Sequence, residues 1–406
     1  MAAVDAQFYW ISAKVPNDEF LLYAFDAADC ADAIKRVRQR ARACPALSVR
    51  LRDRGPLVYP RWVPADAAAE AVLRHDLAEP SWGACLAAVA ALADDQLDLR
   101  RVPWQLHVFA PVFGIPGADG PGTVTVLQLP HALADGARGA ALAGWLFGRP
   151  TPVPAVPPAR PGCFLRRAAG AARAHRQLVR DIRAGSLTAG PGPRPLLATN
   201  TRPAGARSVR TLVRHRSQLR GPTVTVSALV AVSTALSELL GAGADSLGAE
   251  VPMSKPGTRQ ANNHFGSVAV GLYPGLAPDV RAERIAAELA AGRRRQEHPA
   301  ARAADRAFAA VPAPLLRWGV GQFDADARPA GVSGNTVVSS VNRGPADLRF
   351  GEGRVVLTAG YPALSPAMGL VHGVHGIGDT IAISVHAAAS AVADIDEYLG
   401  LLDAAL

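Results

Sequence analysis

Apolar runs and amphipathic segments follow one another along the chain, and their spacing predicts a mixture of strands and helices. Apolar or alternating runs predict strands at 20–26, 47–52, 104–113, 122–130, 246–254, 264–274, 335–342, 353–362, 368–374 and 380–387. Periodic segments predict helices at 27–42, 81–96, 135–147, 164–184, 223–240, 279–296 and 392–406. Because strands and helices mix in both halves without regular alternation, the pattern predicts an α+β fold with mixed sheets.

Two proline-rich segments interrupt this pattern. Residues 149–161 cannot form a regular helix or a central strand, and 188–206 (TAGPGPRPLLATNTRPAGA) has the composition of a linker. A chain of 406 residues is long enough for two or three domains. We therefore predict an N-terminal domain at 1–187, a linker at 188–206 and a C-terminal domain at 207–406.

Composition narrows the class of protein. Hydrophobic residues make up 49% of the chain and charged residues 19%, which favours a large buried core over disorder. The net charge of +9 suits acidic co-substrates, carrier proteins or anionic lipid, but no nucleic-acid motif accompanies it, so we expect no nucleic-acid partner. Four cysteines without CxxC spacing, and no signal-peptide pattern, predict a cytoplasmic protein, with peripheral membrane contact left open.

The strand predicted at 122–130 ends in an unusual group of residues. Pro130 cannot donate a ladder hydrogen bond, so the strand should finish there, directly before His131. Asp135 can fold back under the histidine's loop, and Gly136 allows close backbone approach. A histidine held in this way can take a proton near neutral pH. From spacing alone, an ordinary loop histidine beside a helix-capping aspartate is the favoured interpretation.

The wider context changes that balance. Five segments, in order over nearly the full length, resemble sequence blocks of the bacterial wax ester synthase/diacylglycerol acyltransferase family, within the CoA-dependent acyltransferase and condensation-domain superfamily. They are Val4–Trp10 (VDAQFYW), Asp98–Trp104 (DLRRVPW), His131–Gly136 (HALADG), Val251–Gly275 and Val338–Val356. Their collinear order is more specific than any one motif.

The resemblance implies two chloramphenicol-acetyltransferase-like domains with the active-site channel between them. It places the catalytic base at His131, a structural carboxylate at Asp135 and the motif glycine at Gly136. The family's first motif histidine is Pro130 here, and the arginine that holds the aspartate aligns with Lys255. Asp135 is therefore expected to pair with Lys255 or with nearby Arg259.

Further residues, from the matching segments and from the 372–379 segment that departs from the family's C-terminal signature, are predicted to line the channel or to support it. They are Trp104, Lys255, Asn263, Ser340, Asn342 and His375, of which Trp104 suits a core position and Asn342 an oxyanion donor. His372, His375 and His386 raise the possibility of a metal site. We predict none, because residues three apart in a strand face opposite sides and no cysteine or carboxylate completes the set.

Arginines concentrate in the helix predicted at 164–184. Arg173, Arg176 and Arg180 are predicted to form a basic surface that binds the acyl donor. The alternative interpretation, a crossover helix with a solvated basic face, has equal weight.

These observations predict an O-acyltransferase. It would move an acyl group from acyl-CoA, or from an acyl-phosphopantetheine carrier protein, to a small-molecule alcohol or amine by direct attack, with His131 as general base and no bound cofactor. A stand-alone condensation-type enzyme of natural-product biosynthesis is one alternative, and an inactive binding protein of the same fold is another. A serine hydrolase is excluded because the chain lacks the G-x-S-x-G turn.

Overall fold

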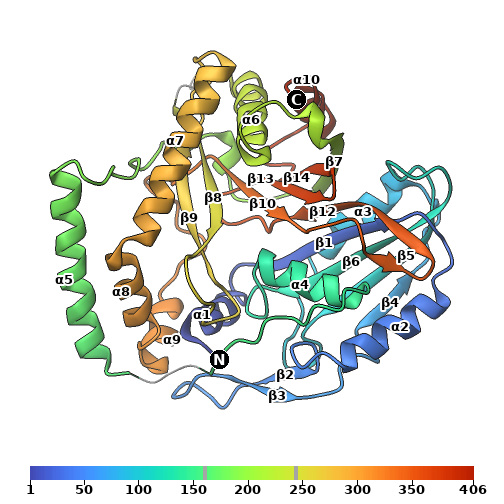
Figure 1. Cartoon of the computed structure of the whole chain (residues 1–406), viewed down its shortest axis with the longest axis horizontal. Helices are drawn as coiled ribbons and strands as arrows, with labels where there is room; N and C mark the ends of the chain where they lie inside the picture. The colour runs from blue at the N-terminus through green and yellow to red at the C-terminus, as the bar shows by residue number, and fades with distance from the viewer. Residues whose placement is uncertain (159–161, 242–245) are drawn as a thin grey trace.

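Two six-stranded sheets organise the fold in the computed structural model, which describes residues 1–158, 162–241 and 246–406 (Figure 1). In spatial order the first sheet contains β11 (Arg349–Phe350), β12 (Gly353–Tyr361), β1 (Asp18–Phe25), β6 (Gly122–Pro130), β5 (Gln105–Val112) and β4 (Val72–His75). The second contains β7 (Arg207–His215), β14 (Thr380–Ala388), β13 (Leu370–Ile377), β10 (Thr336–Asn342), β8 (Gly248–Ser254) and β9 (Phe265–Gly271). Both combine parallel and antiparallel pairs, which confirms the predicted α+β class.

Strands β2 (Val49–Arg52) and β3 (Arg61–Pro64) form a separate pair, and the helices surround the two large sheets. The helices are α1 (Ala3–Ile11), α2 (Ala31–Arg42), α3 (Trp82–Leu92), α4 (Gly136–Leu146), α5 (Phe164–Arg183), α6 (Val224–Leu240), α7 (Pro278–Glu297), α8 (Pro299–Phe308), α9 (Ala313–Gly321) and α10 (Ile395–Ala404), with short 3-10 turns at Ala198–Asn200 and Arg216–Gln218. Ser81 and Thr223 cap α3 and α6 by accepting hydrogen bonds from backbone N–H groups three residues on.

Strand β1 shows how alternation builds the first core. Its residues Leu21, Tyr23 and Phe25 join a cluster with α2 and α4, whereas Phe20 and Leu22 join a second cluster with α3 on the other face. Helices therefore cover both faces of the first sheet, and β1 is buried almost throughout.

The two sheets meet where β12 lies against β13 and β14. A side chain at Gly373 would collide with the carbonyl oxygen of Gly360, so glycine at 373 permits this close backbone approach. Strands β11 and β12 come from beyond the predicted linker at 188–206, yet they pair in the first sheet. The linker is also anchored, because the Thr199 hydroxyl donates to the Asn335 carbonyl oxygen at 2.6 Å. The proposed domains 1–187 and 207–406 are thus joined by more than the linker.

Most predicted elements occur within a few residues of their expected bounds, but several elements were missed. The elements that were not predicted are strands β3, β4, β7 and β11 and helices α1, α8 and α9. In β7, arginines and partly exposed aliphatics alternate weakly, because this strand lies at the edge of its sheet. The described part of the proline-rich segment, 149–158, forms no helix or strand, and residues 159–161 lie outside the described residues.

Candidate active site

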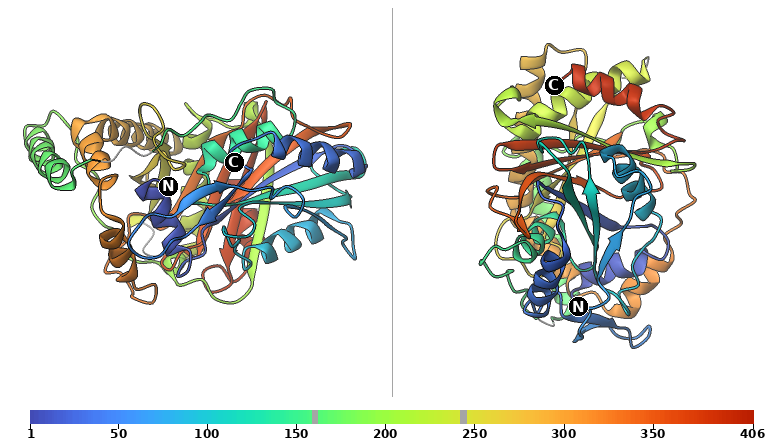
Figure 2. Two further views of the ribbon diagram at one scale, coloured as in Figure 1. Left: turned by 90° about the horizontal axis from the view of Figure 1, so that it is seen from below. Right: turned by 90° about the vertical axis from the view of Figure 1, so that its right-hand side faces the viewer.

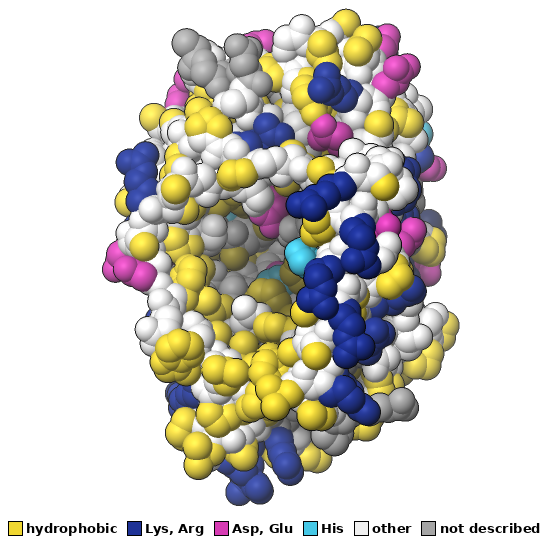
Figure 3. All heavy atoms as spheres, turned by 90° about the vertical axis from the view of Figure 1, so that its left-hand side faces the viewer, with side chains coloured by type: hydrophobic (Ala, Val, Ile, Leu, Met, Phe, Trp, Pro, Cys, Tyr) yellow, Lys and Arg dark blue, Asp and Glu magenta, His cyan; other side chains and the backbone are white. Residues whose placement is uncertain are grey.

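His131 lies directly after β6, at the start of a tight turn. Pro130 is the last residue of the strand and pairs with Asp18, and the Leu133 N–H closes the turn on the Pro130 carbonyl oxygen at 2.8 Å. The imidazole lines a cavity of about 900 Å³, into which its side chain is 18% exposed. Figure 3 shows one face of the molecule deeply hollowed, with hydrophobic and histidine side chains inside the hollow.

The amide of Asn263 fixes which nitrogen of His131 carries the proton. Asn263 Nδ2 donates to the Asp5 carboxylate at 2.9 Å and to the His131 carbonyl oxygen at 2.6 Å. Its Oδ1 therefore faces His131 Nδ1, 2.8 Å away, as an acceptor. This network assigns the proton of the neutral ring to Nδ1 and leaves a lone pair on Nε2, which is the arrangement that a general base needs.

Two side chains of helix α1 hold Asn263 and the His131 ring in place. The buried Asp5 carboxylate accepts the backbone N–H groups of Asn262 and Asn263, each at 3.0 Å. Burial raises the pKa of Asp5, and the hydrogen bonds from Asn263 and Asn262 oppose that rise. One turn along the helix, the Phe8 ring stacks on the His131 imidazole with 4.2 Å between centroids. Asp5 and Phe8 thus fix the 262–263 loop and the plane of the imidazole.

Asp135 joins the same loop to α4. Its carboxylate caps α4 by accepting the Arg138 N–H at 2.9 Å, and it also accepts the His264 N–H at 2.7 Å. Arg259 binds both of its oxygens, Nη1 to Oδ2 at 2.9 Å and Nη2 to Oδ1 at 3.0 Å. Of the two partners predicted for Asp135, Arg259 is therefore the one that binds it, and the Lys255 alternative is wrong.

Lys255 points elsewhere, and its Nζ donates to Asp305 on α8 at 2.7 Å. Geometry explains the choice, because a planar guanidinium can engage both carboxylate oxygens and an ammonium cannot. The supporting arginine is displaced four residues along the loop from the position that the resemblance indicates.

Gly136 begins α4 beside the second sheet. A Cβ at this position would lie 3.1 Å from Val341 Cγ2, so a larger residue would require Val341 to move by a few tenths of an ångström. Gly136 and Ala137 occupy the first two positions of the helix, where backbone N–H groups have no intrahelical acceptor, and both line the 900 Å³ cavity.

The remaining predicted residues divide into two groups. Ser340 and Asn342, at the end of β10, line the cavity with His131. Trp104 is fully buried in the first core, where its Nε1 donates to the Leu47 carbonyl oxygen at 3.0 Å, so it has a supporting position. His375 is buried in β13, and that burial holds its pKa well below the usual value. Within the described ranges, no three His, Cys, Asp or Glu side chains converge as a metal site.

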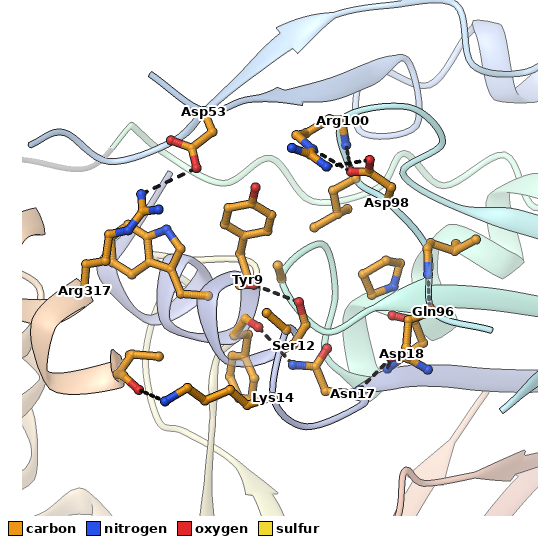
Figure 4. Close-up of a pocket in the computed structure, with 18 of the residues that line it drawn as sticks. Tyr9, Ser12, Lys14, Asn17, Asp18, Asp53, Gln96, Asp98, Arg100 and Arg317 are labelled. Atoms are coloured by element: carbon orange, nitrogen blue, oxygen red, sulfur yellow. Dashed lines mark hydrogen bonds and ion pairs between the residues drawn. The ribbon is translucent and has the colours of Figure 1, made fainter. Parts of the chain in front are cut away.

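A second cavity, of about 460 Å³, approaches the same turn (Figure 4). Pro130 and Ala132 line this smaller cavity, whereas His131 lines the larger one, and Asn17 borders both. In Figure 4 the Tyr9 ring stands between an Asp53–Arg317 pair and an Asp98–Arg100 pair, joined at 3.6 and 2.9 Å. Two compartments thus flank one histidine.

Helix α5 lies at the outer edge of the molecule, beyond α8, against which it packs (Figures 1 and 2). None of its described residues is buried, and Arg173, Arg176 and Arg180 are exposed. Figure 3 shows Lys and Arg side chains gathered along one rim of the hollowed face. The donor-binding role of these three arginines stays a prediction.

Sequence reasoning missed three residues around His131, of which Phe8 and Glu19 face the imidazole and Asp5 holds Asn263. Asp5 and Phe8 lie in the VDAQFYW block, where a lone carboxylate in an otherwise apolar helical segment was the available signal. Glu19, at the start of β1, places Oε1 3.5 Å from His131 Nε2 and lines the larger cavity. For Glu19, the available signal was an acidic residue at the start of an apolar strand.

No protein-family model and no curated protein matches this chain. Solved structures do share its fold. The wax ester synthase/diacylglycerol acyltransferase from Marinobacter aquaeolei VT8 is similar over 99% of this chain and 96% of its own, with a TM-score of 0.62 and 16% identity.

Condensation domains are similar to the same extent. The starter condensation domain of rhizomide synthetase, solved with C8-CoA and Leu-SNAC, matches 99% of this chain and 91% of its own, with a TM-score of 0.60 and 14% identity. The first condensation domain of the calcium-dependent antibiotic synthetase, solved with a substrate analogue, matches 99% of this chain and 93% of its own, with a TM-score of 0.59 and 15% identity. These similarities confirm the predicted two-domain condensation-like fold. Across the described residues, none of the helices has the length and apolarity required to span a bilayer.

Proposed function

We propose that this chain is an acyltransferase that moves an acyl group from a thioester to a small nucleophilic acceptor, with His131 as general base. The observation that carries the proposal is the state of His131. Its Nδ1 is tied to Asn263 at 2.8 Å, and its ring stands at a turn flanked by two cavities. A tautomer fixed in this way leaves Nε2 free to take a proton.

In the proposed reaction the acceptor's nucleophilic atom attacks the thioester carbonyl carbon while His131 Nε2 removes its proton. The tetrahedral oxyanion then collapses, the C–S bond breaks, and the thiolate leaves with the proton from Nε2. The backbone N–H groups of Gly136 and Ala137, at the start of α4, or the side chain of Asn342, are the oxyanion donors that the cavity offers. No covalent intermediate with the protein is required.

The thioester carbonyl and the acceptor's nucleophilic atom would meet in the larger cavity, which His131 lines. The cavity of about 900 Å³ has room for a pantetheine arm and part of an acyl chain, and its walls include Val226, Leu289 and Val337. The structural neighbour with bound C8-CoA and Leu-SNAC supports a CoA or pantetheine thioester as the donor. His131 as the sole base would serve an alcohol, giving the O-acyl product that the sequence resemblance implies, or an amine that arrives unprotonated, as in condensation-type chemistry.

Replacing His131 by alanine tests the proposal. Turnover of a panel of acyl-CoA thioesters and of carrier-loaded acyl groups should fall by roughly 10²–10⁴-fold, the usual contribution of a placed base. The melting temperature should change little, because the ring is at a cavity surface. Activity within a few-fold of wild type would show that His131 is not the base, and a wild-type protein that turns over no donor would favour the inactive binding protein.

A further inference from the structure

Glu19 brings a second titratable group to the reacting centre. Its Oε1 lies 3.5 Å from His131 Nε2, the nitrogen that Asn263 leaves with a lone pair. The carboxylate also lines the larger cavity, into which its side chain is 22% exposed. No other charged group lies within ion-pair distance of it among the described residues.

The charges around Glu19 come from several elements. Asp135 on the α4 side is neutralised by its bidentate pair with Arg259. Arg343, after β10, is buried and attracts the carboxylate. Burial is nevertheless the largest influence and raises the pKa of Glu19. Glu19 is therefore a mostly buried carboxylate beside His131 Nε2, and burial raises its pKa more than the charges of His131 and Arg343 lower it.

A lone pair on Nε2 and a carboxylate oxygen repel each other unless a proton or a cationic donor stands between them. An ammonium group meets this requirement, because it presents three N–H donors and carries positive charge. A neutral hydroxyl offers one donor, which either Nε2 or Glu19 can accept, but not both. The pair thus has the composition of a binding site for a protonated amine.

Resting on the acyl transfer proposed above, we propose that Glu19 is a second catalytic base, and that the preferred acceptor is a protonated primary amine that the enzyme converts to an amide. An amine with a pKa of about 10.4 is unprotonated in only roughly 1 of 1,000 molecules at pH 7.4, so an enzyme that uses such an acceptor must remove that proton. His131 alone cannot supply both proton transfers.

The two bases divide the steps between them. The Glu19 carboxylate first takes one proton from R–NH₃⁺, giving Glu19-COOH and R–NH₂. The nitrogen lone pair then forms the C–N bond at the thioester carbonyl, and a second N–H proton moves to His131 Nε2. The C–S bond breaks, the thiolate takes the proton from Nε2, and Glu19 returns its proton to water. The sum is R–NH₃⁺ plus thioester giving amide, thiol and one H⁺.

The test compares three acceptors of similar length with wild-type protein and the Glu19→Gln variant. With octanoyl-CoA, or the best donor of the panel, kcat/KM is measured for hexylamine, for O-pentylhydroxylamine, which is unprotonated at pH 7.5, and for hexan-1-ol. Glu19→Gln should lower kcat/KM with hexylamine, relative to the other two acceptors, by roughly 10²–10⁴-fold, the usual contribution of a placed base. The other two acceptors carry no ammonium proton and are the reference for this ratio, because Glu19 lines the cavity and its replacement can change all three rates.

Glu352→Gln is the matched control, because this glutamate is 93% exposed in a turn and its variant should leave all three rates unchanged. Selective loss with hexylamine, together with a melting temperature near that of wild type, supports the proposal. Equal loss with all three acceptors, or a wild-type preference for hexan-1-ol, overturns it while acyl transfer itself stands. If no acceptor is acylated by the wild-type protein with any donor, or if His131→Ala retains full activity, the proposed function fails and this inference fails with it.

Discussion

Replacing Asp135 by alanine should destabilise the protein and also slow the reaction. The carboxylate is 5% exposed and accepts four N–H groups, two from Arg259 and one each from the backbone of Arg138 and His264. The truncation removes the cap of α4, which typically contributes about 1 kcal/mol. It also leaves the partly buried guanidinium without its counter-charge, and breaking such a pair typically costs about 3–5 kcal/mol.

Because these two losses share the same carboxylate, we expect a total of about 4 kcal/mol. At roughly 2 °C per kcal/mol for a chain of this length, the melting temperature should fall by about 8 °C. Asp135→Asn keeps one acceptor oxygen for the helix cap and should lose about half as much. Activity should fall as well, since the His264 N–H and the neighbouring Asn263 would no longer be held against His131.

Differential scanning calorimetry and turnover of the same preparations provide the measurements. Asp305→Ala is the matched control, because Asp305 pairs with Lys255 where the two side chains are 50% and 31% exposed, and exposed pairs contribute about 0–1 kcal/mol. If Asp135→Ala melts within about 1 °C of wild type, or no lower than Asp305→Ala, the carboxylate does not hold the loop as argued.

Two further predictions concern charge. The first is that Arg173, Arg176 and Arg180 bind the donor's phosphates or its carrier protein. Replacing all three by Gln should then raise the donor KM and flatten its dependence on salt, with kcat little changed, because salt screens exposed charges beyond about 8–10 Å. An unchanged KM and salt slope would assign α5 to a solvated crossover. Burial raises the pKa of Asp18 from 3.8 to about 6, so the native state binds this proton more tightly than the unfolded state does, and stability should fall as pH rises between those values. Asp18→Asn, neutral at every pH, should therefore melt several degrees above wild type at pH 7.5, and that advantage should vanish near pH 4; equal melting at both pH values would contradict the raised pKa.

Local chemistry was visible in the sequence, whereas contacts between distant segments were not. The end of β6, the cap at Ser81 and the start of α6 at Thr223 follow from proline, serine and threonine at fixed offsets from apolar runs. The Arg259 partner of Asp135 was left as one of two alternatives, since sequence distance does not say which side chain reaches across a loop. Helix α5 shows the same limit, because its apolar Leu165 is 76% exposed and the sequence does not show that the helix would pack mainly on α8.

The position of Pro130 was less informative in sequence than it is in space. It stands where the family that the sequence resembles has a histidine, directly before His131. Pro130 pairs with Asp18 and lines the smaller cavity, so a polar group at this position would face away from the compartment that holds His131 Nε2 and Glu19. A substitution at position 130 alters the wall of the smaller cavity but does not change the tautomer of His131, because Asn263 sets that tautomer. The titratable neighbour of the base is instead supplied by β1, one residue along from the partner of Pro130, on the opposite face of the strand because successive side chains alternate.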